Sequence, residues 1–416
     1  MMKVLLRVYF WIIGLYARCI KLPESVLIHR AGAVDDLVLL VKERNIRSVL
    51  LVTDIVLMKL RVPERLLNGL RDHGIDCAVF DGVVPNPTTD NVYAARRIYV
   101  ENGCEAVIAC GGGSVIDCAK MTAVMVKTSR TIISFNRLIP AIRHRALLYA
   151  VPTTAGSGSE VTMTAVITDS DRDVKLPIND KMLVPDAAVL DPLLMTGLPA
   201  GITAETGMDA LTHAVESYIG RWNYSEAMEY SKKAVRLICT NIALACTDGS
   251  HLEARSAMAL AAYYAGLSFR KASLGYTHAV AHRMSELYGI PHGRANAIIL
   301  PHVLEYSLSS CRRRLAELAR AAGIAGSDVR ADESARRFIS HIRALNRSLD
   351  IPSYIDALEE KDIPEIARRA LHEARKYYPV PRIMNMKQMR VFVRSLKPEY
   401  TGNRNEPTGL GTDASV

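Results

Sequence analysis

Four histidines and one aspartate in the second half of the chain have the spacing of metal ligands. Asp209 and His213 lie four residues apart in GMDALTHAVE, while YTHAVAHRMSELYGIPHG holds His278, His282 and His292. Residues four apart share one face of a helix. One carboxylate and several imidazoles can therefore enclose a divalent cation, and spacing alone does not distinguish Fe²⁺ from Zn²⁺.

These five side chains are more than an open catalytic metal site needs, because a metal that also binds a substrate oxygen must keep a free position. One histidine is therefore expected to act beside the metal, as a proton carrier or as a group that orients a ligand. A single histidine of this kind would more often be structural. The gathering of five groups in two helical segments is what favours a metal site.

A glycine-rich turn in the first half of the chain is suited to bind an anion. CGGGSVID places Gly112, Gly113 and Ser114 between a predicted strand and a helix that carries Asp117. Consecutive glycines let a ligand approach the backbone, and a helix N-terminus offers free N–H groups to a pyrophosphate. By itself the motif is weak, because a tight strand–helix turn uses the same residues.

A second loop, VPTTAGSGSEVT, also follows a predicted strand. Thr153, Thr154 and Ser157 supply hydroxyls there, and the glycines leave room for the phosphate, ribose or amide of a cofactor. The alternative is a loop stabilised by its own hydroxyl–backbone hydrogen bonds. Two such loops in one parallel sheet favour a nucleotide site more than either loop does alone.

The elements that must position these residues change character near residue 198. Before it, short β-branched strands alternate with helices, the pattern of a parallel α/β sheet, and after it the chain is all-helical in pattern. We predict an α/β dinucleotide-binding domain at 1–198, a helical metal-binding domain at 199–400 and a frayed polar tail at 401–416. Strands are expected at 48–54, 76–83, 105–114, 145–154 and 186–192, and helices at 61–74, 204–220, 225–246, 251–268, 275–288, 311–322, 332–348 and 363–376.

Composition excludes several classes of protein. In 416 residues, 49% hydrophobic and 23% charged residues exclude disorder as the main state, and no apolar run reaches 18 residues, which excludes a multi-spanning membrane protein. The net charge of +9 is scattered without a basic stripe, so we expect no nucleic-acid partner. Eight cysteines without a CxxC pair indicate reduced thiols in the cytoplasm.

The apolar run VYFWIIGLY at 8–16 lies between Arg7 and Arg18. It is too short to span a bilayer, and no small-residue cleavage site follows it. We interpret it as a helix or strand that packs on the body of the protein or on a partner subunit, rather than as a membrane anchor.

Together these motifs resemble those of the iron-containing (group III) alcohol dehydrogenase family. The similarity runs from about Leu22 to about Leu396, and FDGVVPNPTTDNV, GGGSVIDCAK, PTTAGSGSEVT, GMDALTHAVESY and HAVAHRMSELYGIPHGRANAIILPHV occur in the family's order. The resemblance implies a Rossmann-like dinucleotide-binding domain followed by a helical metal domain. It also implies a homodimer or higher homo-oligomer that transfers hydride between a nicotinamide cofactor and a small alcohol, aldehyde or ketone.

The resemblance further implies roles for single residues. The metal, Fe²⁺ with Zn²⁺ as the alternative, would be bound by Asp209, His213, His278 and His292. His282 would then lie beside the nicotinamide and the substrate as the catalytic group. The cofactor contacts would be Asp54, Asn86, Gly112, Gly113, Ser114, Asp117, Thr153, Thr154, Ser157 and Lys175.

Asp54 bears on the choice of cofactor. It matches the family position at which an acid meets the adenosine ribose, where a carboxylate accepts bonds from the 2′-hydroxyl and repels a 2′-phosphate. We therefore expect NAD(H) to be preferred over NADP(H). The alternative role for Asp54 is a helix N-cap.

The chain departs from the family in its cations. After Phe269, Arg270 and Lys271 replace a small polar pair, and Arg283 and Arg294 stand in the segments that carry the later histidines. If these cations face the site, the substrate is a small anionic aldehyde, such as phosphonoacetaldehyde or a semialdehyde. If helix geometry turns them outward, they are ordinary surface charge.

Two other functions remain open for this fold: a lyase of the dehydroquinate-synthase type, and a non-catalytic member that forms structural filaments. The intact GMDALTH and PHG motifs speak against the lyase. Loss of a metal ligand would mark a non-catalytic member, and all four ligand residues are present.

Overall fold

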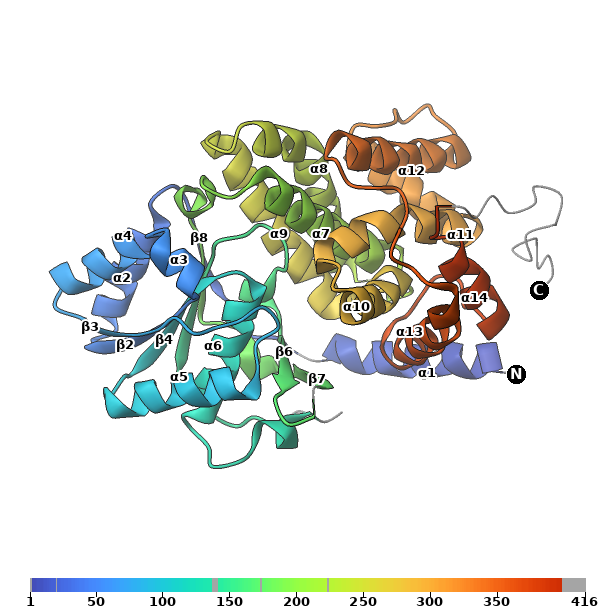
Figure 1. Cartoon of the computed structure of the whole chain (residues 1–416). Helices are drawn as coiled ribbons and strands as arrows, with labels where there is room; N and C mark the ends of the chain where they lie inside the picture. Colours follow the sequence, from blue (N-terminus) through green and yellow to red (C-terminus); the bar gives the residue numbers. More distant parts are fainter. Residues whose placement is uncertain (1, 20, 137–140, 173, 223, 399–416) are drawn as a thin grey trace. The chain divides into compact units, whose positions relative to one another are not determined.

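The computed structural model describes residues 2–19, 21–136, 141–172, 174–222 and 224–398. They form two compact units that are discontinuous in sequence (Figure 1). The sheet unit contains Lys21–Pro199 and Thr247–Arg270. The helical unit contains the first helix, Ala200–Cys246 and the described chain from Lys271 onward.

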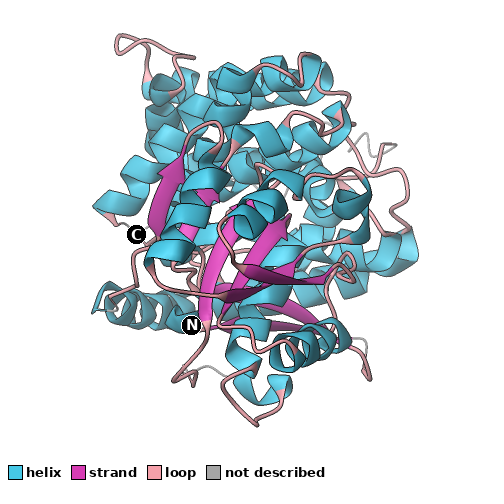
Figure 2. Cartoon of the chain, turned by 90° about the vertical axis from the view of Figure 1, so that its left-hand side faces the viewer, coloured by secondary structure: helices cyan, strands magenta, loops and turns pink. Residues whose placement is uncertain are grey.

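A six-stranded parallel sheet, in the order β1-β8-β5-β4-β2-β3, is the centre of the sheet unit (Figure 2). Its strands are β1 (Val26–His29), β2 (Ser48–Val52), β3 (Asp76–Phe80), β4 (Ala106–Gly111), β5 (Leu147–Pro152) and β8 (Ala187–Leu190). A separate antiparallel hairpin is formed by β6 (Thr164–Asp169) and β7 (Val174–Asn179).

Both faces of the sheet are covered, which explains why its strands are continuously apolar rather than alternating. In β2, Leu50 and Val52 pack on one face against α5 (Thr89–Glu101) and α6 (Gly113–Met125). Val49 and Leu51 pack on the other face against α2 (Ala33–Glu43) and α4 (Glu64–Asp72). The short helix α3 (Ile55–Lys59) follows β2.

The remaining helices belong wholly or in part to the helical unit. They are α1 (Met2–Cys19), α7 (Ala200–Ile219), α8 (Ser225–Thr247), α9 (Leu252–Ala272), α10 (Tyr276–Tyr288), α11 (His292–Ala321), α12 (Ala331–Ser348), α13 (Ile363–Tyr377) and α14 (Met386–Arg394). Short 3-10 turns lie at Ile132–Phe135, Ser159–Val161, Lys181–Leu183, Pro192–Met195 and Glu360–Asp362. In the described part of the chain, no helix has both the length and the apolarity to cross a membrane.

The predicted fold class is confirmed: a parallel α/β sheet is followed by an all-helical part. The compact units differ from the predicted boundaries, because α1 groups with the helical unit and Thr247–Arg270 groups with the sheet unit. The second exchange has a packing cause. The backbone of Gly266 in α9 approaches that of Gly158 so closely that a Cβ on Gly158 would lie 2.8 Å from the Gly266 Cα.

Candidate functional site

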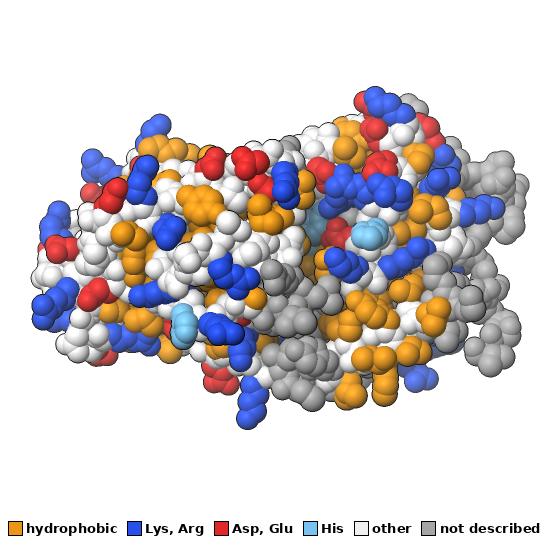
Figure 3. Space-filling model, turned by 90° about the horizontal axis from the view of Figure 1, so that it is seen from below, with side chains coloured by type: hydrophobic (Ala, Val, Ile, Leu, Met, Phe, Trp, Pro, Cys, Tyr) orange, Lys and Arg blue, Asp and Glu red, His pale blue; other side chains and the backbone are white. Residues whose placement is uncertain are grey.

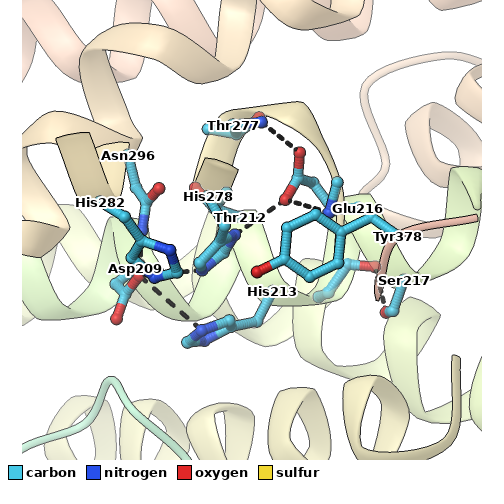
Figure 4. Close-up of polar contacts among 12 residues, drawn as sticks. Asp209, Thr212, His213, Glu216, Ser217, Thr277, His278, His282, Asn296 and Tyr378 are labelled. Atoms are coloured by element: carbon cyan, nitrogen blue, oxygen red, sulfur yellow. Dashed lines mark hydrogen bonds and ion pairs between the residues drawn. The ribbon is translucent and has the colours of Figure 1, made fainter. Parts of the chain in front are cut away.

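The helical unit brings the predicted metal ligands together around one carboxylate oxygen (Figure 4). Asp209 Oδ1 lies 3.9 Å from His213 Nε2, 3.7 Å from His278 Nε2 and 3.8 Å from His292 Nε2. The ligand atoms of Asp209, His278 and His292 all lie within 4.8 Å of one another. These separations are too long for hydrogen bonds.

The same separations are close to those of atoms that share a metal. Two ligands about 2.1 Å from a tetrahedral ion would be about 3.4 Å apart. His278 is only 1% exposed, and its Nε2 has no hydrogen-bond partner among the described residues. An unpartnered imidazole nitrogen at this depth is costly unless an ion binds it. The donor set therefore fits a divalent metal.

Burial closes the cluster on one side and leaves it open on the other. Asp209, His213 and His278 are buried, whereas the side chains of His292 and His282 are 37% and 33% exposed. A site that is buried on one side and exposed to solvent on the other can bind a metal and still admit a substrate.

The electrostatics favour the ligating protonation states. Burial, together with neighbouring His213, lowers the pKa of His278 well below its ordinary value, so that this imidazole is neutral at neutral pH. Burial raises the pKa of Asp209, but the imidazoles around it and the Asn296 amide outweigh this effect and lower it overall. Neutral imidazole and ionised carboxylate are the forms that bind a cation.

Glu216 is a residue beside the cluster that the sequence motifs did not point to. Its carboxylate accepts hydrogen bonds from the backbone N–H groups of Gly275 (2.9 Å) and Thr277 (2.7 Å) and lies 2.8 Å from Nδ1 of His278. It thereby caps the first turn of α10 and fixes the ring that faces Asp209. A signal was available, because Glu216 follows Asp209 by seven residues and shares its face of α7.

Glycines allow the helices to come this close. A Cβ on Gly275 would lie 2.6 Å from the Glu216 carboxylate, and a Cβ on Gly293 would collide with the backbone carbonyl of Glu205 in α7. The glycine of the PHG motif is thus what lets the start of α11 place His292 next to Asp209.

His282 is held apart from the cluster by a second carboxylate. Its Nδ1 lies 2.7 Å from Glu373 Oε1 on α13, and its ring stacks on that of His292 with centroids 5.2 Å apart. Glu373 also accepts a hydrogen bond from the Tyr378 hydroxyl (2.6 Å) and pairs with Arg283 (3.3 Å). Burial raises the pKa of Glu373, but these partners, His282 first, lower it to about 2. Glu373 and Tyr378 were also missed, because nothing local links them to His282.

In the sheet unit, the predicted nucleotide loops meet at a topological switch point. β2 and β4 are neighbours in the sheet. After β2 the chain continues to β3, which lies on one side of this pair, and after β4 it continues to β5, which lies on the other side. In open α/β sheets, ligands bind at the carboxyl ends of strands where the direction of connection reverses. Asp54 follows β2, and Gly112–Ser114 follow β4.

The two predicted phosphate loops lie against each other. A Cβ on Gly112 would lie 3.6 Å from Thr154 Oγ1, and a Cβ on Gly113 would lie 3.0 Å from the Ser157 side chain. Thr153 is buried, and its backbone N–H donates to Gly111 at 3.1 Å. No side chain caps the N-terminus of α6, so its first N–H groups remain available to an anion.

Asp117 connects helix α6 to the second loop and to the hairpin through hydrogen bonds. Its partly buried carboxylate accepts hydrogen bonds from the Ser159 hydroxyl (2.6 Å) and the Val166 N–H (2.9 Å). Nearby, buried Lys120 donates to Ser159 and Thr162, both at 3.0 Å. These contacts tie α6 to the second loop and the hairpin, so Asp117 positions the loops rather than presenting its carboxylate to solvent.

The other predicted cofactor residues lie at the surface. Asp54 is the N-cap of α3, where its Oδ1 accepts from the N–H groups of Val56 and Leu57 at 2.9 Å, so the alternative role is realised. Lys175 donates to Asn86 Oδ1 at 2.8 Å, which brings together two predicted contacts that are 89 residues apart.

The four predicted cations have partners within the protein. Lys271 pairs with Glu226 (3.1 Å), Arg283 with Glu286 and Glu373, and Arg294 with Glu205 (3.7 Å). Arg270, next to Phe269 on α9, donates to the carbonyl oxygen of Val161 at 3.3 Å.

Two family models match the chain. The model of iron-containing alcohol dehydrogenases matches residues 23–192, and that of the C-terminal part of the Fe-containing alcohol dehydrogenase family matches residues 203–396. Together they cover most of the chain.

Similar proteins agree with this result. The 1,3-propanediol dehydrogenase of Klebsiella pneumoniae is 37% identical over 335 residues, which is 80% of this chain and 87% of that protein. The crystal structure of a 1,3-propanediol oxidoreductase superposes with a TM-score of 0.86 at 34% identity, covering 91% of this chain and 100% of that one. A sulfoacetaldehyde reductase from Bifidobacterium kashiwanohense in complex with NAD⁺ gives 0.84 at 25% identity, covering 91% and 98%. The resemblance seen in the motifs is therefore confirmed, and the chain belongs to the iron-containing alcohol dehydrogenase family of alcohol and aldehyde oxidoreductases.

Proposed function

We propose that this protein is an Fe²⁺-dependent enzyme that transfers hydride between NAD(H) and a small alcohol or aldehyde. The proposed metal ligands are Asp209, His213, His278 and His292. The observation that carries the proposal is the convergence of three imidazole Nε2 atoms, at 3.7–3.9 Å, on one carboxylate oxygen. The family supports iron over zinc, because its name specifies the metal.

When bound, the metal would stabilise negative charge on the substrate oxygen as a Lewis acid, and the nicotinamide would accept or give the hydride. The chain's own residues prepare the site. Glu216 orients the His278 ring, and Glu373 holds Nδ1 of His282. Since His282 lies on the open side of the cluster, its Nε2 is the group that we propose takes the proton of an alcohol and returns it to an alkoxide.

The cofactor half of the proposal rests on the sheet unit. The uncapped start of α6 and the hydroxyls of Thr154 and Ser157 would hold the pyrophosphate. Asp54 would exclude a 2′-phosphate and so favour NAD(H). The NAD⁺ complex of the sulfoacetaldehyde reductase supports this choice of cofactor.

The test is a metal analysis of two variants. After reconstitution with Fe²⁺ under anaerobic conditions, His278→Ala should lose both bound metal and activity. His282→Ala is the matched control, because it lies one turn further on the same helix. It should keep its metal content while kcat falls by about a hundredfold or more. Full metal occupancy in His278→Ala, or equal metal loss in both variants, would contradict the ligand assignment.

A small anionic aldehyde remains the narrower hypothesis for the substrate. It is favoured by the similarity to a sulfoacetaldehyde reductase, whose substrate is anionic. The ion pairs of Lys271, Arg283 and Arg294 weaken it, since a cation already paired has less attraction for a substrate. A comparison of kcat/KM for succinic semialdehyde, phosphonoacetaldehyde and neutral aldehydes of similar size decides it. Equal values for charged and neutral aldehydes would reject the anionic substrate.

We also propose a cytoplasmic homodimer or higher homo-oligomer. No disulfide bond forms between the cysteines whose side chains the structure describes, which supports a reducing compartment. Light scattering on the purified enzyme measures the oligomeric state.

A further inference from the structure

Helix α1 precedes residue 23, where the match to the family model begins, and it packs on the helical unit through one face. The Trp222 indole N–H donates to the carbonyl oxygen of Phe10, and the Tyr224 hydroxyl donates to that of Gly14, both at 2.8 Å. A Cβ on Gly14 would lie 2.8 Å from Trp222 Nε1, so glycine is what permits this approach. Phe10 is buried at 6% exposure.

The opposite face of α1 is apolar and exposed (Figure 3). At about 100° per residue, its large side chains form one continuous stripe about 160° wide. The stripe consists of Leu5 (62% exposed), Val8 (49%), Tyr9 (37%), Trp11 (68%), Ile12 (55%) and Leu15 (51%). Single exposed apolar residues are ordinary, but a contiguous patch of six marks an interaction surface.

Cations border this stripe. A cavity of about 380 Å³ beside α1 is lined by Arg7 and Arg221 together with Trp11, Trp222 and Tyr224. Burial, and then the positive charges of Arg7 and Arg314, lower the pKa of Arg221. Within the described ranges, no carboxylate pairs with Arg7 or Arg221, so both guanidinium groups can bind an external anion.

The charges beside the stripe indicate which kind of partner binds it. A second copy of the chain, facing the stripe with its own stripe, would bring the unpaired cations of both copies into one interface, where like charges repel. An anionic lipid surface would instead supply phosphates to the arginines and acyl chains to the stripe. Trp and Tyr side chains also favour the level of the headgroups.

We propose that α1 is a docking helix that lies in the surface of an anionic lipid bilayer. The stripe enters the boundary between headgroups and acyl chains, and Arg7 and Arg221 contact lipid phosphates. The helix rests on the bilayer without crossing it, so the enzyme is recruited as a peripheral protein. This inference does not depend on the metal or on the substrate.

The chain contains two tryptophans, Trp11 and Trp222, and both lie at this helix, which provides a direct probe. Full-length protein is mixed with phosphatidylcholine vesicles, with or without phosphatidylglycerol. We expect it to sediment with the anionic vesicles and to be released by salt. In a Trp222→Phe variant, the emission of Trp11 should shift to the blue and be quenched by brominated lipids.

Variants locate the contact. Trp11→Ser combined with Leu15→Ser should abolish sedimentation, whereas Val100→Ser on α5, which removes an apolar side chain 62% exposed elsewhere, should leave it unchanged. Arg7→Gln should weaken binding about fivefold. All four positions are exposed, and unchanged circular dichroism confirms that the variants are folded.

Three results would overturn the proposal. The first is no sedimentation with anionic vesicles at low salt, and the second is equal loss of binding in the Val100→Ser control. The third is a change of oligomeric state in the Trp11→Ser, Leu15→Ser variant, which would identify a second copy of the chain as the occupant.

Discussion

At the scale of single residues, two histidines of the site are each held by a carboxylate, one buried and one partly buried. Glu216 binds Nδ1 of His278, and Glu373 binds Nδ1 of His282, at 2.8 and 2.7 Å. In each case the carboxylate fixes the ring and directs the opposite nitrogen, Nε2, toward the site. The histidines therefore differ in role because their surroundings differ, although they lie on one turn of the same helix.

Removing Glu373 should damage catalysis without removing the metal. We expect Glu373→Ala to lower kcat about 10- to 100-fold, with KM and metal content nearly unchanged, because the His282 ring loses its orientation. Glu373→Gln should recover part of the loss, since an amide oxygen still accepts a hydrogen bond from Nδ1. Steady-state kinetics and metal analysis of both variants measure this. No recovery by Gln, or metal loss in the Ala variant, would contradict a positioning role.

The cofactor prediction can be separated from the capping role of Asp54. Asp54→Asn keeps an N-cap of similar strength but removes the charge, so discrimination against NADP(H) should relax while stability is retained. Asp54→Gly should relax it too, because the charge is again absent. Values of kcat/KM for both cofactors test this. A wild-type preference for NADP(H) would refute the assignment.

At the scale of elements, the loops and helices are positioned by close backbone approaches. A Cβ on Gly266 of α9 would lie 2.7 Å from Val161 Cγ2 and 2.8 Å from the carbonyl oxygen of Gly158. Gly158 itself has φ +63°, in the left-handed region that favours glycine. This contact places the hydroxyl-bearing loop against α9.

Gly266→Ala should therefore destabilise the protein by about 1–3 kcal/mol. The sign of this change in stability is informative, because alanine in place of glycine inside a helix would otherwise stabilise the protein by about 0.5–1 kcal/mol. Gly197→Ala is the control, because nothing lies within 4 Å of a Cβ there, and it should be nearly neutral. Urea denaturation of both variants measures the difference. Similar midpoints for Gly266→Ala and wild type would show that the contact is loose.

At the scale of the whole molecule, the charges that matter for stability are few and buried. Exposed pairs such as Arg65 with Asp35 contribute little each. Glu160, by contrast, is only 2% exposed, and burial raises its pKa to about 7. In the same cluster, burial lowers the pKa of Lys120 to about 8.

The raised pKa of Glu160 makes stability depend on pH. From about pH 4.5 to about pH 7, the folded protein keeps a proton that the unfolded chain has lost, so the free energy of unfolding falls as the pH rises. Glu160→Gln resembles the protonated form and lacks this decline. Its Tm should match wild type near pH 4.5 and exceed it near pH 7, a range that ends below the pKa of Lys120. Thermal scans that stay parallel over this range would contradict the prediction.

The sequence by itself determined the fold class, and it predicted the two candidate phosphate loops and the candidate metal ligands that the structure brings together. It could do so because strand and helix periodicity are local and because Asp209 and His213, four apart, must share a face. Even so, it missed the hairpin of β6 and β7, helix α14 and the part of α11 that precedes residue 311. Pro301 lies inside α11, and the packing of α11 against α7 and α12 preserves the helix across a residue that normally ends one.

Only the tertiary structure decided which carboxylates contact the histidines and which cations already form ion pairs. Glu216 meets a residue 62 positions away, and Glu373 meets one 91 positions away, so no local pattern connects them. The same holds for Lys271 and Glu226, which are 45 positions apart. Sequence periodicity fixes the face on which a side chain lies, whereas its partner depends on how helices pack, and packing is a property of the whole fold.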